Sequence, residues 1–184
     1  MAQYNGGVSI PHTTWEAFRN ATMGNGYDYD GYYGNQCWDY CQELYYQYNM
    51  FLHLGPNGYA YEAWTVAKWQ NLGTQFMAVN NLSEVKRGDI LVWSASFAPP
   101  TGHISFADED YDGSGYIWSV GQNQESPSAT VGHPVTRDRF HIAPYFLGAF
   151  RNKDWWVPPT PPTPTDWSKR KFPWPIAWKY WGYK

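Results

Sequence analysis

Cys37 is the residue of this sequence best placed for nucleophilic chemistry. It follows a loop rich in glycine and aspartate, residues 24–31, and opens a predicted helix that begins near Gln36 or Cys37 and runs to about residue 49. The free N–H groups and the positive dipole end of a helix N-terminus stabilise a thiolate, the form that attacks a carbonyl. Cys41 lies one turn later on the same face, where the parallel Cβ directions disfavour a disulfide. Packing in the core is the alternative role for either thiol, and we assign it to Cys41.

A cysteine hydrolase also needs a base, normally a histidine that the fold brings to the thiol. The chain has five histidines: His12, His53, His103, His133 and His141. His103 follows a glycine and heads a predicted strand, which places it at the mouth of a sheet, whereas the others lie in loops or polar stretches. His103 is therefore the candidate base, with a purely structural histidine as the alternative.

Three carboxylates, those of Asp28, Asp30 and Asp39, fall within twelve residues around a glycine turn. Carboxylates so close together need a counter-charge, and calcium, which takes 6–8 oxygen ligands, suits an irregular loop. The alternative is an Asx-type turn with solvated acids and no metal. A second acidic turn, residues 108–113, is expected to be a solvated hairpin loop.

The elements that must position these residues follow from the pattern of the chain. A capping box with Thr13 as N-cap and Glu16 at the third helical position predicts a first helix to about residue 23. A third helix is predicted over residues 61–70. Short β-branched and aromatic runs predict strands at residues 89–93, 103–107, 116–120 and 146–150. Helices followed by an antiparallel sheet indicate the α+β class.

The 184 residues allow one domain and a short appendage. We expect a domain over residues 1–156, a proline- and threonine-rich linker over 157–165, and a basic, tryptophan-rich tail over 166–184. The net charge is −3. Residues 1–165 carry 8 basic and 15 acidic side chains, whereas residues 166–184 carry 5 basic side chains and 1 acidic one. An acidic body argues against nucleic acid as a partner.

Membrane insertion is not expected either. The mean hydropathy is −0.62, and no run approaches the ~18 apolar residues of a spanning helix. The first residues lack the basic start and apolar stretch of a signal peptide, so the sequence predicts none.

Four sequence blocks occur in a familiar order. They are Gly-Asn-Gln-Cys-Trp-Asp at 34–39, Arg-Gly-Asp-Ile-Leu-Val-Trp at 87–93, Gly-His-Ile-Ser-Phe at 102–106 and Val-Gly-Gln-Asn at 120–123. Together, over about residues 10–152, they resemble the CHAP family, the cysteine, histidine-dependent amidohydrolases/peptidases of phage lysins and bacterial wall hydrolases. The resemblance implies a papain-like fold, with the N-terminal helices packed on a C-terminal antiparallel sheet. It also implies that Cys37 is the nucleophile and His103 its base.

The third catalytic residue is where the chain departs from the family. The family's common acid, a glutamate two residues before an asparagine, falls on Gly121. Asn123 matches the family's asparagine and is the expected partner of the imidazole N–H, with Gln122 as the alternative. The backbone N–H of Cys37 and, by its position, Gln36 are expected to hold the oxyanion.

Calcium is the cofactor that the resemblance implies, and no organic cofactor is expected. The ligands would be the side chains of Asp28, Asp30 and Asp39 and the carbonyls of Tyr32 and Gly34. Bound there, the ion would order the loop that leads into the nucleophile.

The implied function is that of a phage endolysin, which cleaves an amide bond of peptidoglycan. The bond would be the muramoyl–alanine amide or a peptide or cross-bridge bond. We expect a monomer, made without a signal peptide in the infected cytoplasm of a Gram-positive host and released to the wall by a holin-type partner. The alternatives are a virion-associated or bacterial wall hydrolase, or a non-catalytic wall-binding module on a degenerate scaffold. Gly121 favours the last, and the intact Cys37, His103 and Asn123 argue against it.

Overall fold

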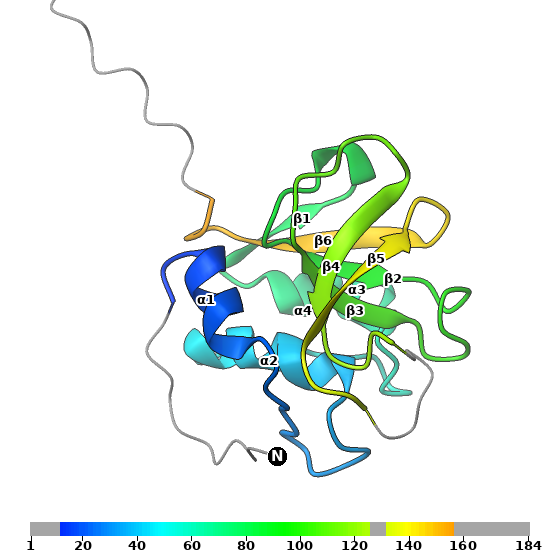
Figure 1. Ribbon diagram of the computed structural model, residues 1–184. Coiled ribbons are helices and arrows are strands. Elements are labelled where there is room, and N and C mark those ends of the chain that lie inside the picture. Colours follow the sequence, from blue (N-terminus) through cyan, green and yellow to red (C-terminus); the bar gives the residue numbers. More distant parts are fainter. Residues whose placement is uncertain (1–11, 126–131, 157–184) are drawn as a thin grey trace, which may run out of the picture.

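A computed structural model describes residues 12–125 and 132–156 of the chain. Four helices, a 3₁₀ turn and six strands follow one another along it, and the helices gather against the sheet (Figure 1). The helices are α1 (Trp15–Thr22), α2 (Cys37–Gln47), α3 (Glu62–Thr65) and α4 (Lys68–Leu72), with the 3₁₀ turn at Leu82–Glu84. The strands are β1 (Phe76–Val79), β2 (Ile90–Trp93), β3 (His103–Ala107), β4 (Tyr116–Gly121), β5 (Thr136–His141) and β6 (Phe146–Asn152).

This architecture confirms the predicted α+β fold. The six strands form one sheet in the order β1-β6-β2-β3-β4-β5, and every neighbouring pair is antiparallel. The four expected strands form its centre, and β1 and β5 are the additional edge strands. The linker over 157–165 and the tail over 166–184 lie outside the described residues. Within the described part of the chain, no helix is long and apolar enough to cross a membrane.

The two faces of the sheet bury separate apolar clusters, because successive side chains of a strand point to opposite sides. Ile104 and Phe106 of β3 pack under α1 and α2 with Phe18, Tyr40 and other aromatic residues. Ala107 belongs to the cluster on the opposite face, which includes Trp93. By the same alternation, His103 and Ser105 point to this second face. The two faces are connected at the start of β3, where Ile104, whose backbone the Cys37 thiol of α2 contacts, directly follows His103.

The helix boundaries differ from the predicted ones in three places. Thr14, not Thr13, caps α1: its side chain accepts the Ala17 N–H at 3.1 Å, and Glu16 pairs with Arg87 instead of closing a capping box. The helix α2 ends at Gln47 because Asn49 adopts a left-handed conformation, with φ 53°.

The helix expected over residues 61–70 is divided into α3 and α4. Thr65 and Val66 are β-branched neighbours, and such residues are stiff and fit poorly in helix interiors. The chain leaves helical geometry directly after them, at Ala67, whose φ is −100° and ψ 9°.

The acidic turn that begins at Asp108 is not simply a solvated loop. The Asp108 side chain is only 7% exposed and forms ion pairs with Arg19 of α1 and Arg137 of β5. It also accepts the indole N–H of Trp15 at 3.1 Å. One carboxylate thus ties the first helix to the β5 edge of the sheet.

A buried ion pair fastens β6 to the entrance of β2. Arg151 donates from Nε and Nη2 to the two carboxylate oxygens of Asp89, each at 2.8 Å, and Nη2 also donates to the Glu84 carbonyl. The Lys86 N–H completes the set by donating to Asp89. Asp89 is 1% exposed, so its charge depends on these donors.

We expect Arg151→Met to lower the free energy of unfolding by about 3–5 kcal/mol, because it leaves Asp89 buried without its counter-charge. Urea denaturation followed by tryptophan fluorescence measures the change. The matched control is Lys86→Met, which breaks the exposed pair of Lys86 with Asp110 and should cost about 1 kcal/mol or less. Equal losses in the two variants would contradict the assigned role of the buried pair.

Candidate active site

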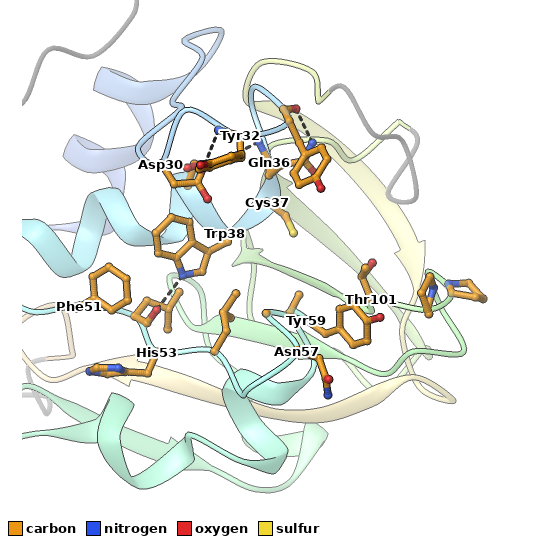
Figure 2. Close-up of a pocket in the computed structure, with 18 residues that line it drawn as sticks. Asp30, Tyr32, Gln36, Cys37, Trp38, Phe51, His53, Asn57, Tyr59 and Thr101 are labelled. Carbon is orange, nitrogen blue, oxygen red and sulfur yellow. Dashed lines mark hydrogen bonds between the residues drawn. The ribbon is translucent and has the colours of Figure 1, made fainter.

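Cys37 is the first residue of α2, as the sequence predicts, and its sulfur points into a cavity of about 800 Å³ (Figure 2). The helix start is held by Asp39, whose Oδ2 accepts the Gln36 N–H at 3.0 Å. Burial raises the pKa of the Cys37 thiol to about 11, partly offset by a hydrogen bond from the Ile104 backbone, and the nearby Asp39 charge raises it further. At neutral pH the resting form is therefore the thiol.

His103 is fully buried at the start of β3, where the strand register pairs it with Trp93. The rings of Trp93 and Phe97 lie around it, each with its centroid 5.9 Å from that of the imidazole. This apolar setting lowers the pKa of His103 to about 3, mainly through burial, so the ring is neutral. Neither ring nitrogen has a hydrogen-bond partner within the described part of the chain.

The structure brings the two predicted catalytic residues to the same region without a hydrogen bond between them. The Cys37 thiol contacts the backbone of Ile104, the residue directly after His103. The loop that precedes His103 supplies Pro100 and Thr101 to the wall of the Cys37 cavity, whereas His103 itself is fully buried and does not line the cavity.

Gln122, the alternative third catalytic residue, is fully occupied elsewhere. Its Oε1 accepts the Tyr27 N–H at 2.6 Å, and its Nε2 donates to the carbonyls of Tyr27 and Gln36 at 2.9 and 2.8 Å. Tyr27 and Gln36 are the two ends of the loop that leads into Cys37. Gln122 therefore fastens this loop to the end of β4, and we correct its expected role from a partner of the imidazole to a clamp of the loop.

Asn123 and Gln36, predicted as third catalytic residue and oxyanion residue, lie together. The Asn123 Nδ2 donates to the Gln36 Oε1 at 3.1 Å, and the Gln36 Nε2 donates to the Tyr33 carbonyl at 2.8 Å. Asn123 has a left-handed backbone, with φ 55°, and its N–H donates to the His133 carbonyl. The pair therefore borders the first turn of α2, which contains Cys37, the predicted nucleophile.

The three predicted metal-binding carboxylates also converge. One oxygen each of Asp28, Asp30 and Asp39 can be chosen so that all lie within 4.8 Å of one another. Asp39 is buried and accepts the Tyr29 N–H at 2.8 Å. Its pKa is raised to about 8, first by burial and then by the neighbouring charge of Asp30, with a smaller effect of Asp28. Such a cluster of hard oxygens with unbalanced charge fits a calcium ion.

The two predicted carbonyl ligands, those of Tyr32 and Gly34, lie in the same loop as Asp28 and Asp30. Gly34 adopts a left-handed conformation, with φ 66°, and its carbonyl already accepts the Gln36 N–H at 2.8 Å. A carbonyl oxygen has a second lone pair, so this bond leaves room for a cation. Tyr32 is 68% exposed and lies at the rim of the cavity beside Asp30 (Figure 2).

The cavity walls contain residues that the sequence reasoning did not single out. Trp38, Phe51 and Tyr59 form much of its apolar lining, and His53 and Asn57 add polar groups on the side opposite Gln36 (Figure 2). The Trp38 indole is fixed because its N–H donates to the Leu52 carbonyl at 2.8 Å. Trp38 belongs to α2, and the other four come from the segment between α2 and α3. Apart from His53, which has no patterned neighbours, this segment carries no catalytic residue type, so only the folded chain reveals its place at the cavity.

We expect Gln122→Met, which has nearly the same shape but lacks the hydrogen bonds, to lower the free energy of unfolding by about 2–4 kcal/mol, because it leaves buried backbone groups of Tyr27 and Gln36 without partners. Urea denaturation measures this loss. An unchanged denaturation midpoint would show that the loop does not depend on Gln122.

Known proteins resemble this chain in sequence and in structure. A D-alanyl-L-alanine endopeptidase of Streptococcus phage B30 is 30% identical over 116 residues, which are 60% of this chain and 25% of that protein. The chain thus spans about a quarter of the length of this relative. The crystal structure of the wild-type endolysin LysIME-EF1 matches with a TM-score of 0.60 and 28% identity, over 76% of this chain and 64% of that one. The CHAP domain model matches residues 24–123, which include Cys37, His103 and Asn123, and the chain belongs to the CHAP domain family.

Proposed function

We propose that this protein hydrolyses an amide bond of bacterial peptidoglycan, with Cys37 as the nucleophile and His103 as the base. The observation that carries the proposal is the position of the Cys37 thiol. It stands at a helix start, opens into a cavity and touches the backbone beside His103. Membership of the CHAP family and the likeness to a phage endopeptidase and an endolysin support a wall substrate.

The proposed mechanism begins from the neutral pair. As the Cys37 sulfur attacks the amide carbonyl, its proton passes to a ring nitrogen of His103, so that no free thiolate has to form in the buried site. The backbone N–H of Cys37 and the amide of Gln36 stabilise the oxyanion. The imidazolium then protonates the leaving amine as the C–N bond breaks. Water hydrolyses the thioester, which releases the acid and restores the thiol.

A peptide bond of the wall is the favoured substrate, because the phage B30 relative is named a D-alanyl-L-alanine endopeptidase. The muramoyl–alanine amide is the alternative, and mass spectrometry of released wall fragments distinguishes the two. We further propose that the protein acts as a monomer on Gram-positive walls and reaches them through a holin-type partner. A non-catalytic wall-binding module would show the same binding without fragment release.

We expect Cys37→Ala to reduce the clearing of Gram-positive cell walls by at least about 10³-fold, because it removes the group that forms the thioester. Turbidity of a wall suspension measures the rate. The control is Cys41→Ala, which removes the fully buried second thiol of α2 and should retain clearing. Clearing that survives in Cys37→Ala would rule out the proposed nucleophile.

We also propose that Asp28, Asp30 and Asp39 bind a calcium ion, with the carbonyls of Tyr32 and Gly34 as further ligands. The convergent carboxylates and the raised pKa of Asp39 support this assignment. When bound, the ion would neutralise the cluster and hold the loop that ends at Cys37. It would lie outside the path of the proton and the nucleophile, so its effect on activity would be structural.

Calcium should stabilise the protein more at pH 8 than at pH 6. Folding raises the pKa of Asp39 from 3.8 to about 8, so without metal its ionisation destabilises the fold increasingly as the pH rises from about 4 through 8. Calcium binds the ionised form and offsets this loss. Thermal unfolding with calcium or with EDTA at both pH values measures the effect.

Asp39→Asn should abolish the calcium-dependent rise in melting temperature, whereas Asp112→Asn, at an exposed carboxylate in another turn, should retain it. If chelation changes neither the melting temperature nor the clearing rate of the unaltered protein, the calcium proposal fails.

A further inference from the structure

Gly121 leaves a space on the sheet that the side chain of Gln124 fills. A Cβ added at position 121 would lie 3.0 Å from the Ser105 Cβ and 3.2 Å from both Cδ and Oε1 of Gln124. The β3–β4 register, in which Phe106 pairs with Val120, continues to place Ser105 opposite Gly121. The Gln124 amide therefore occupies the volume that a side chain at position 121 would enter.

The orientation of this amide is determined by its neighbours. The Gln124 Nε2 donates to the carbonyls of Ser119 and Thr136, at 2.9 and 3.1 Å, and a carbonyl can only accept. Both amide hydrogens are thus used, and Oε1 must point the other way, where it accepts the Ser119 hydroxyl at 2.9 Å. Gln124 is 1% exposed, so water does not compete for the oxygen.

A buried polar network connects this oxygen with the surroundings of His103. Ser119 Oγ lies 2.7 Å from Ser105 Oγ, which accepts the indole N–H of Trp93 at 3.0 Å. Trp93 is the cross-strand partner of His103, and Ser105 lies on the same face of β3 as His103. All members of the network are buried, so their hydrogen bonds hold the Gln124 amide in one position.

Gln124 is also the side chain that acts on the imidazole. Burial has the larger effect and lowers the pKa of His103, and the contact with Gln124 raises it, as an oxygen that faces a ring N–H does. The contact does not meet the geometry of a hydrogen bond in this structure, and catalytic hydrogen bonds are often long or poorly aligned without substrate. Asn123, in contrast, directs its amide N–H to Gln36.

We propose that Gln124 is the positioning residue of His103. Its side chain occupies the space that a side chain at position 121 would fill, which is available because residue 121 is a glycine. The Gln124 Oε1 accepts the N–H of the ring nitrogen that faces it, which fixes one tautomer and leaves the other nitrogen free to take a proton. That this proton comes from Cys37 rests on the proposed function. The tautomer itself can be tested without any activity.

The first test measures the ring ¹⁵N chemical shifts of His103 at pH 7 in the full chain carrying Cys37→Ala, assigned by comparison with His103→Gln. We expect a single tautomer, and a mixture of both tautomers when Gln124→Met is added. Gln42→Met is the matched control: Gln42 is another buried glutamine, bonded to the Leu52 N–H and the Met50 carbonyl. It should lower stability and leave the His103 shifts unchanged.

The second test restores an acceptor from the other position. In the double variant Gly121→Glu/Gln124→Ala, the carboxylate enters the space that the shortened residue 124 vacates. We expect Gln124→Met to lower the wall-clearing rate about tenfold or more, and the double variant to regain most of it. The acid limb of its pH profile should move to higher pH, because a carboxylate raises the pKa of a neighbouring imidazole.

A folded Gln124→Met protein with unchanged His103 shifts would overturn the proposal. If Gln124→Met does not fold, the ring shifts of the double variant test the proposal instead. Mixed tautomers of His103 in a folded double variant would also overturn the proposal. If the unaltered protein clears no walls, the proposed function fails, while the ring shifts still decide the role of Gln124.

Discussion

Three hydrogen bonds from one buried amide hold the site together. Backbone groups that are removed from water must find partners inside the protein, and Gln122 supplies them to both ends of the loop between Tyr27 and Gln36. The loop carries Asp28 and Asp30 toward Asp39, and its end delivers Cys37 to the first turn of α2. Gln122 thus fixes the position of the loop relative to the sheet. The carboxylate cluster, the start of α2 and the cavity wall all depend on that position.

The register of the sheet determines the surroundings of His103. Pairing of β2 with β3 sets Trp93 against His103, and pairing of β3 with β4 brings Ser105 to Gly121. After β4, Asn123 adopts a left-handed backbone, and the side chains of Gln122, Asn123 and Gln124 bond to different groups. Gln122 thus bonds to the ends of the loop, Asn123 to the Gln36 side chain, and Gln124 to the serine network near His103.

The features that sequence could predict are those with strong local signals. The glycine-rich loop before Cys37, the Gly-His start of β3 and the β-branched runs each have a local physical cause, and the central strands and α2 lie close to their predicted positions. The strand β5 was missed because its residues, Thr-Arg-Asp-Arg-Phe-His, are polar and mostly half-exposed at a sheet edge. The role of Gln122 depends on partners 86 and 95 residues away, which no local pattern reports.

The burial of Cys37 also affects its sensitivity to oxidation. Peroxides and other oxidants react with thiolates far faster than with thiols, and they need access to the sulfur. Cys37 is only 9% exposed, and burial keeps it in the thiol form across the neutral range. A buried thiol of this kind is a poor substrate for oxidative damage, so the burial that delays its ionisation also protects the residue from oxidants.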